Sequence, residues 1–251
     1  MQNPQILIIG AGATGLIAAR TLAKAGKKVT ILEARNRCGG RIHTRNQELF
    51  FKNAELGAEF VHGDLPVTLN LLNEAGIPYH SANAEMWHYE NGKFSQEGEF
   101  KDWDRVVEKL GRLKEDISIK EFLEKEFAGV DNEGLRKSVI GFVSGYDTAD
   151  PAKASSFALR EEWQNEDFEA QYRIKGGYGV MIRYLEEECK KDGAEIHLNS
   201  IVKEIHWQPG KIKAITSNGT VHEASQILLA LPLGVLQAGK NEQGALTFIP
   251  D

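Results

Sequence analysis

The first 32 residues alternate between unbroken apolar runs and a helical pattern of apolar positions. Residues 6–9 form a continuous apolar run, which is typical of a strand buried on both faces of a parallel sheet. Over residues 13–25 the apolar side chains recur at helical spacing, and Arg20 and Lys24 fall on the face expected to meet solvent. A second apolar run follows at residues 29–32. The pattern therefore predicts a strand–helix–strand unit with a right-handed crossover.

Helical patterns dominate residues 60–172. A short helix is expected to begin at Pro66, a longer one covers residues 102–115, and another covers residues 131–144. The sequence Ser-Ile-Lys-Glu at residues 118–121 is a capping box, which predicts a helix start there. We therefore interpret residues 60–172 as a mostly helical insertion that forms part of a substrate domain.

Strand patterns return after a predicted helix at residues 180–191. The dipeptide Asn218-Gly219 separates two β-like runs and predicts a hairpin with a two-residue turn. Residues 227–231 form a further unbroken apolar run, which is expected to rejoin the first parallel sheet. The expected organisation is a discontinuous α/β domain, residues 1–59 with 173–251, that carries the helical insertion.

Composition indicates a globular chain and excludes several function classes. The 251 residues are 41% apolar and 26% charged, as in soluble domains, and the length fits one large domain or two small ones. A net charge of −6 offers no basic surface for nucleic acid or for an anionic membrane. Two cysteines, Cys38 and Cys189, cannot form a disulfide framework or a four-ligand zinc site, so we expect no metal and a reducing compartment. With neither a leader nor a membrane segment expected, the predicted location is cytoplasmic.

A glycine-rich turn separates the first predicted strand from the first predicted helix. It reads Gly10-Ala11-Gly12-Ala13-Thr14-Gly15, the G-x-G-x-x-G fingerprint of dinucleotide-binding proteins. In this motif the glycines permit a tight turn, close approach of a pyrophosphate and close helix packing, while the helix N-terminus favours negative charge. Glu33 ends the second strand, where its carboxylate can accept hydrogen bonds from a ribose diol. An acidic residue there disfavours a 2′-phosphate, which leaves NAD and FAD as candidates.

Residues 37–41 distinguish these two dinucleotides. The run Arg37-Cys38-Gly39-Gly40-Arg41, joined to the fingerprint by Glu33-Ala34-Arg35, resembles the doubled-glycine signature of the flavin amine oxidase family. In that family the loop passes beside the pyrophosphate and the flavin of FAD. Paired glycines permit close approach of the backbone, and Arg41 offers a fixed positive charge to the anionic cofactor. The resemblance implies a Rossmann-like, FAD-binding α/β domain of the doubled-glycine type.

Further segments resemble the same family in the same order along residues 6–248. Residues 56–63 are similar to the segment that follows the isoalloxazine ring, and their His-Gly ending is typical of the polyamine oxidase branch. Residues 176–179 resemble the return to the FAD domain, residues 231–236 resemble a segment of monoamine and polyamine oxidases, and Val202 matches the strand whose backbone meets adenine. The cofactor contacts that the resemblance implies are Gly10, Gly12, Ala13, Thr14, Gly15, Glu33, Ala34, Arg35, Gly39, Gly40, Arg41, Gly57, Ala58, Glu59, Phe60 and Val202.

The sequence assigns no catalytic residue. His62 and Glu59 are candidates for the substrate cavity; the alternatives are an ordinary loop histidine and a structural salt bridge. Neither Cys38 nor Cys189 matches the cysteine that bonds to flavin in some relatives, so the FAD is expected to bind non-covalently.

The resemblance implies oxidation of a small-molecule amine by hydride transfer to the flavin, with oxygen as the final acceptor. An amino-acid oxidase, another flavin desaturase and a catalytically silent FAD-binding fragment are the alternatives.

Chains of this family are much longer than this one, and residues 248–251 resemble the family's midpoint. By resemblance, the C-terminal part of the fold would contain the lysine near flavin N5, the aromatic side chains around the amine and the last strand of the FAD domain. We therefore expect an N-terminal half or subunit that is inactive alone, with a complementary C-terminal chain or a second copy as its partner. A shortened relative with altered activity is the remaining alternative.

Overall fold

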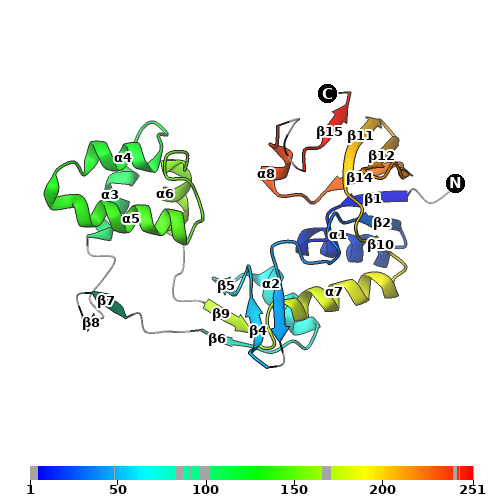
Figure 1. The fold of residues 1–251 in the computed structure, drawn as a ribbon, viewed down its shortest axis with the longest axis horizontal. Coiled ribbons are helices and arrows are strands. Elements are labelled where there is room, and N and C mark those ends of the chain that lie inside the picture. Colours follow the sequence, from blue (N-terminus) through cyan, green and yellow to red (C-terminus); the bar gives the residue numbers. More distant parts are fainter. Residues whose placement is uncertain are drawn as a thin grey trace. The chain divides into compact units, whose positions relative to one another are not determined.

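The computed structural model describes residues 5–47, 49–82, 87–90, 92–95, 102–165, 171–239, 242 and 244–250. Their contacts divide the chain into two compact units. One unit comprises Met1–Ser81 with Tyr172–Asp251, and the other comprises Ala82–Gln171. The first unit mixes helices and strands, whereas the second is mainly helical (Figure 1).

A four-stranded parallel sheet lies at the centre of the first unit. Its strands, in spatial order, are β10 (Glu195–His197), β2 (Lys28–Leu32), β1 (Gln5–Ile9) and β14 (Gln226–Leu229). Ile8 lies opposite Ile31 on one side and opposite Leu228 on the other. The predicted strand–helix–strand unit is therefore confirmed, and the late apolar run does join the same sheet.

Both faces of this sheet are covered, which explains why its strands are apolar without alternation. Ile6 and Ile8 face the helices α1 (Ala13–Lys24) and α7 (Gly179–Lys191), which pack against each other beside the sheet (Figure 1). Leu7 and Ile9 face the opposite way and pack against residues of a second sheet.

The second sheet is a β-meander with one added parallel strand. Its order is β13 (Val221–Ala224), β12 (Lys211–Thr216), β11 (Val202–Gln208) and β15 (Thr247–Ile249). The hairpin predicted at Asn218-Gly219 is present, but its loop has three residues: Thr216 N–H donates to the Thr220 carbonyl (3.0 Å), and Gly219 N–H donates to the Thr216 carbonyl (2.9 Å). Within this loop Gly219 has a positive φ, of 82°, whereas Asn218 does not, and the Asn218 side chain accepts a hydrogen bond from the Thr220 N–H (3.0 Å).

Residues 60–81 belong to the first unit, contrary to the boundary expected at residue 60. They contain β5 (Phe60–His62), α2 (Pro66–Glu74) and β6 (Tyr79–Ser81). The two strands flank β9 (Gln171–Ile174) in a three-stranded sheet, and Leu72 is buried in the core that contains α1 and α7. Three-residue strands are too short to produce a recognisable alternation, so the sequence pattern could not place this boundary.

A second hairpin, β3 (Thr44–Gln47) with β4 (Phe51–Glu55), and a short helix, α8 (Leu233–Leu236), complete the first unit.

The second unit is a small helical bundle. It contains β7 (His88–Glu90), β8 (Lys93–Ser95), α3 (Trp103–Gly111), α4 (Ile119–Glu126), the 3-10 turn η1 (Val130–Asn132), α5 (Glu133–Gly145) and α6 (Ser156–Asn165). The helix start predicted from the capping box is confirmed, since Ser118 Oγ accepts a hydrogen bond from the Glu121 N–H (3.2 Å), while the Glu121 carboxylate pairs with Lys125. The core is apolar and aromatic: Phe122 and Phe127 are almost fully buried there.

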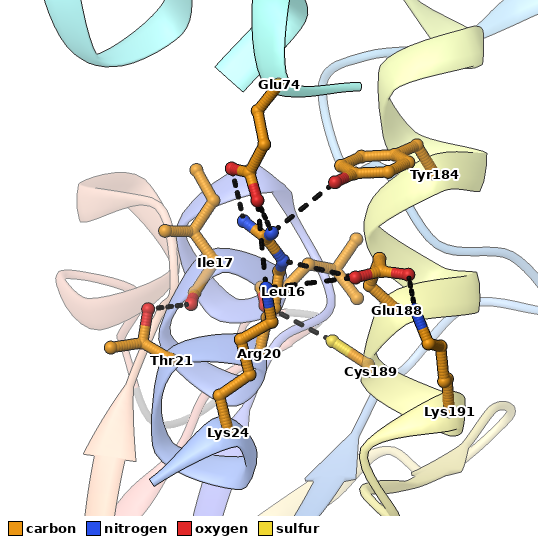
Figure 2. Close-up of polar contacts among 10 residues, drawn as sticks. All are labelled: Leu16, Ile17, Arg20, Thr21, Lys24, Glu74, Tyr184, Glu188, Cys189 and Lys191. Atoms are coloured by element: carbon orange, nitrogen blue, oxygen red, sulfur yellow. Dashed lines mark hydrogen bonds and ion pairs between the residues drawn. The ribbon is translucent and has the colours of Figure 1, made fainter. Parts of the chain in front are cut away.

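Arg20 was expected on the solvent face of α1, but its side chain is only 12% exposed. Its guanidinium pairs with Glu74 of α2, lies 4.0 Å from Glu188 of α7 and donates to the Tyr184 hydroxyl at 3.4 Å (Figure 2). Lys24 joins the same carboxylates at 3.7 and 3.8 Å while remaining about half exposed. The partners come from helices distant in sequence, so the periodicity of α1 alone could not reveal them.

None of the helices in the described ranges combines the length and the apolar character that a membrane crossing needs.

Candidate functional site

The glycine turn between β1 and α1 contains glycines of two kinds. A Cβ on Gly15 would overlap the carbonyl oxygen of Gly10, and a Cβ on Gly10 would lie 2.5 Å from the carbonyl oxygen of Ala230. These two positions therefore need glycine for packing within the protein. Gly12 differs, because no atom lies within 4 Å of the position its Cβ would take. The space beside Gly12 is left open by the chain, as close approach of a ligand requires.

The N-terminus of α1 faces this turn without a capping group from the protein. Gly12 is the N-cap residue, no side chain caps the helix, and its first turn has no acidic residue. Ala13 and Thr14 are the first helical residues, and Thr14 is exposed. The positive end of the helix dipole is thus available to an anionic group such as a pyrophosphate.

Glu33 is held at the end of β2 by hydrogen bonds to its carboxylate. Oε2 accepts the backbone N–H of Ala11 (2.7 Å) and Oε1 accepts that of Arg35 (2.9 Å). The residue is 7% exposed, and its own N–H donates to the His197 carbonyl at 2.9 Å. Each carboxylate oxygen retains a second acceptor position, so a diol could still bind to it. Ala34, the next residue, is exposed.

The doubled-glycine loop is bonded directly to the glycine turn. The Gly39 N–H donates to the Ala11 carbonyl (2.8 Å), Gly12 and Gly39 form an isolated parallel bridge, and a Cβ on Gly40 would lie 3.4 Å from the Gly12 Cα. Gly39 and Gly40 have positive φ angles of 106° and 59°, which favour glycine. Two motifs separated in sequence therefore form one continuous backbone surface.

Arginine side chains support this loop from within. Arg35 donates to the Gly40 carbonyl (2.8 Å), and Arg37 donates to the carbonyls of Gly40 (2.9 Å) and Ile42 (3.0 Å). Burial lowers the pKa of Arg37 from its ordinary value. Arg41 is exposed, and among the described residues its side chain has no hydrogen bond or ion pair. Arg37, which was not among the predicted site residues, thus shapes the loop, while Arg41 keeps a charge available to a ligand.

The segment that begins at Gly57 packs on the same loop. A Cβ on Gly57 would overlap the Arg41 carbonyl oxygen, and the N–H of Ala58 donates to that carbonyl at 3.3 Å. Glu59 forms an ion pair with Arg173, whose guanidinium lies 4.8 Å from the centroid of the Phe60 ring. The sequence had left a salt bridge open as the alternative for Glu59, and the structure contains it.

His62 and Val202 have contrasting surroundings. His62 is exposed at the end of β5, and its ring centroid lies 5.8 Å from that of Phe60. Val202 is 8% exposed, and its side chain packs in the core with Leu7 and Leu32. Only the backbone of Val202 could therefore meet a ligand.

Thr44 and Glu55 position the start of α7, and the sequence contained no signal for them. Thr44 Oγ donates to Glu55 Oε2 (2.7 Å) and accepts the Gly179 N–H (2.7 Å), while Glu55 Oε1 accepts the Tyr178 N–H (2.6 Å). A Cβ on Gly177 would lie 2.6 Å from Glu55 Oε1. The β3–β4 hairpin is thereby fastened to the glycines that precede α7.

No group of three or more His, Cys, Asp or Glu side chains in the described ranges is arranged to hold a metal ion.

Comparison with known proteins identifies relatives that are similar in sequence over most of this chain. Over 99% of its length the chain is 30% identical to human Lysine-specific histone demethylase 2, of which it covers 32%. It is 26% identical over 95% of its length to Polyamine oxidase 2 of Arabidopsis thaliana, of which it covers 53%. The chain therefore spans between about a third and about half of these relatives.

A solved structure of a putrescine oxidase triple mutant has the same fold. It superposes with a TM-score of 0.75 over 98% of this chain and 60% of that one, at 22% identity. The family model for flavin containing amine oxidoreductases matches residues 13–250, and this match includes the doubled-glycine loop and all but the first three positions of the glycine turn. The chain belongs to the flavin containing amine oxidoreductase family.

Proposed function

We propose that the first unit is a Rossmann-like domain that binds FAD non-covalently. The observation that carries the proposal is the hydrogen bond from Gly39 to Ala11, which joins the doubled-glycine loop to the glycine turn beside the open position at Gly12. A pyrophosphate would lie at the start of α1, and Glu33 would accept the hydroxyls of the adenosine ribose. Gly40 and Gly57 would extend this surface, since Gly40 packs beside Gly12 and Gly57 packs on the Arg41 carbonyl.

The chain's own residues would orient and shield the flavin. Arg41 would offer its charge to the anionic cofactor, and the Gly57–Ala58 backbone, packed on the doubled-glycine loop, would form a wall beside the ring system. When bound, the flavin would supply the hydride acceptor for oxidation of an amine and would be reoxidised by oxygen. Glu59 and His62 would face the substrate, and neither is proposed as a catalytic base.

The substrate class we propose is an amine. The relatives' names refer to polyamines and to histone lysine, and the structural neighbour's name refers to putrescine; these ligands share an amino group. Because the chain spans about half of Polyamine oxidase 2, we also propose that full turnover needs groups from a complementary chain or a second copy.

A visible absorption spectrum of the purified chain tests the cofactor, since bound FAD has characteristic flavin bands. Addition of mono- and polyamines under anaerobic conditions should bleach those bands if amines are oxidised, and peroxide release in air should follow. Flavin bands that do not bleach would support FAD binding but contradict amine oxidation by residues 1–251. A chain that takes up NAD and no FAD would contradict the proposal.

A further inference from the structure

The two backbone segments that border the proposed flavin position leave the same end of the β3–β4 hairpin. Thr44 begins β3 three residues after Arg41 of the doubled-glycine loop, and Glu55 ends β4 two residues before Gly57. Thr44 and Glu55 are direct partners in the antiparallel register. Gly57 and Ala58 are both exposed, so a ligand can reach this wall. The base of the hairpin therefore sets the spacing between the doubled-glycine loop and the Gly57–Ala58 wall.

Hydrogen bonds of defined direction fasten this base to the start of α7. The Glu55 carboxylate accepts the Tyr178 N–H at 2.6 Å and the Thr44 hydroxyl proton at 2.7 Å. Because the hydroxyl gives its single proton to Glu55, its oxygen can accept the Gly179 N–H at 2.7 Å. A Cβ on Gly177 would lie 2.6 Å from both Glu55 Oε1 and Thr44 Cγ2, so the contact leaves room only for glycine. We refer to the Thr44–Glu55 pair as the hairpin clamp.

The helix α7 gives the hairpin clamp a rigid support. Its Met181 and Leu185 are buried in the core that also contains α1, and α1 begins at the glycine turn. The hairpin clamp therefore relates the Gly57–Ala58 wall to the turn proposed to hold the pyrophosphate. Glu33, at the proposed ribose position, instead accepts hydrogen bonds from the backbone N–H groups of Ala11 and Arg35. The two carboxylates thus act on different parts of the proposed cofactor site.

We propose that Thr44 and Glu55 are positioning residues for the flavin end of the cofactor. They act through the backbone that follows Glu55, by holding the Gly57–Ala58 wall at the distance from the glycine turn that the ring system needs. The inference rests on the proposed FAD binding and deepens it, because it assigns the two ends of the dinucleotide to separate residues. Glu33 controls the adenosine end, and the hairpin clamp controls the flavin end. A clamp that only stabilised the fold would affect both ends alike.

Calorimetric titration of the 251-residue chain with FAD and with ADP separates these two roles, because ADP has the adenosine and the pyrophosphate but no flavin. Glu55→Gln keeps the side-chain shape but replaces one acceptor oxygen with a donor, so the Thr44 proton loses its acceptor. This variant should bind FAD about tenfold more weakly, while its affinity for ADP stays within about twofold of the unaltered chain. The visible circular dichroism of the bound flavin should also weaken at saturating FAD, since the wall beside the ring has moved.

Substitutions at Thr44 provide an independent test and a rescue. Thr44→Val removes the hydroxyl but leaves the hydrogen bond between Glu55 and Tyr178, and it should show the same selective loss of FAD affinity. Thr44→Ser keeps the hydroxyl and should bind FAD like the unaltered chain. Asn46→Ala is the matched control, because it removes the 2.6 Å hydrogen bond from the Asn53 N–H within the same hairpin. It should change neither affinity.

Two results would overturn the proposal: an equal loss of FAD and ADP affinity in the variants, and unchanged FAD affinity in both Glu55→Gln and Thr44→Val. Thermal unfolding establishes that each variant is folded, and Thr44→Val decides the outcome if Glu55→Gln does not fold. An unaltered chain that binds no FAD would remove the proposed function and this inference with it. An unaltered chain that binds FAD, with variants that bind it equally well, would remove the inference alone.

Discussion

The Glu33 carboxylate accepts a hydrogen bond from the backbone N–H of Ala11 at 2.7 Å, across 22 positions of the chain. A second N–H, from Arg35, donates to the other carboxylate oxygen. One acidic side chain thus joins the end of β2 to the glycine turn, and in the proposed complex it would also bind the ribose. Local stability and cofactor affinity should therefore change together when Glu33 is altered.

Glu33→Ala should weaken FAD binding by about 1–3 kcal/mol, because the ribose loses charge-assisted hydrogen bonds. The free energy of unfolding should also fall by about 1–3 kcal/mol, since two N–H groups lose their acceptor. Quenching of flavin fluorescence reports the first quantity and urea denaturation the second. Glu204→Ala, at a half-exposed carboxylate on β11, is the control and should change neither. An unchanged FAD affinity in Glu33→Ala would remove the ribose assignment.

Alanine at Gly12 should mainly reduce FAD affinity, whereas alanine at Gly15 should mainly reduce the stability of the chain. Gly12→Ala adds a methyl group to open space at a φ of −72°, so it should cost under about 1 kcal/mol of stability while reducing FAD affinity at least tenfold. Gly15→Ala drives a methyl group into the Gly10 carbonyl and should destabilise the chain by about 3 kcal/mol. Thermal unfolding and FAD titration of the two variants check this contrast. Normal FAD binding by a folded Gly12→Ala variant would show that the open space is not the cofactor site.

Arg20→Met should destabilise the first unit by about 1–2 kcal/mol, because it leaves Glu74 and Glu188 without their least exposed partner (Figure 2). Lys24 contacts the same carboxylates, but its side chain is 46% exposed. Lys24→Met should therefore lower the free energy of unfolding by under about 0.5 kcal/mol. Chemical denaturation of both variants measures the difference. Equal effects would mean that burial of Arg20 is irrelevant to the network.

Both cysteines should resist alkylation in the folded protein. Burial raises the pKa of Cys38 to about 12 and that of Cys189 to about 11. The reactive thiolate forms as pH rises through the pKa, so at pH 8 only about one Cys38 in ten thousand and one Cys189 in a thousand would be ionised. Iodoacetamide labelling, followed by mass spectrometry, should be at least 100-fold slower in buffer than in urea. Equal rates in the two solvents would show that the thiols are accessible and ordinary.

The elements predicted correctly from sequence are those specified by neighbouring residues. The helix start at Ser118 and the strand–turn–helix around the glycine fingerprint each depend on contacts within a few positions, so the sequence pattern contains their cause. The apolar run at residues 227–231 was also placed correctly, because strands buried on both faces have few alternatives to a parallel sheet.

The features missed from sequence depend on partners that are remote in the chain. The three-stranded sheet joins Tyr79 to Ile174, and Arg20 pairs with carboxylates 54 residues away or more. In the candidate site, the glycine and acidic positions were predicted from their motif, whereas Arg37 and the Thr44–Glu55 pair act through backbone carbonyls and N–H groups. Side chains of many types can bond to backbone groups, so these contacts leave no motif in the sequence. The three-dimensional structure is needed to identify the residues that make them.

The parallel pairing of β14 with β1 has a consequence for synthesis of the chain. The Ser225 hydroxyl donates to the Gln5 carbonyl across 220 positions, so the central sheet gains this strand only after most of the chain has left the ribosome. The helices of the second unit make contacts of much shorter range, which form early and quickly. The inserted bundle can therefore fold before Ala230, whose carbonyl packs against Gly10, is in place beside the glycine turn. The proposed cofactor site is thus among the last parts of the described chain to be assembled.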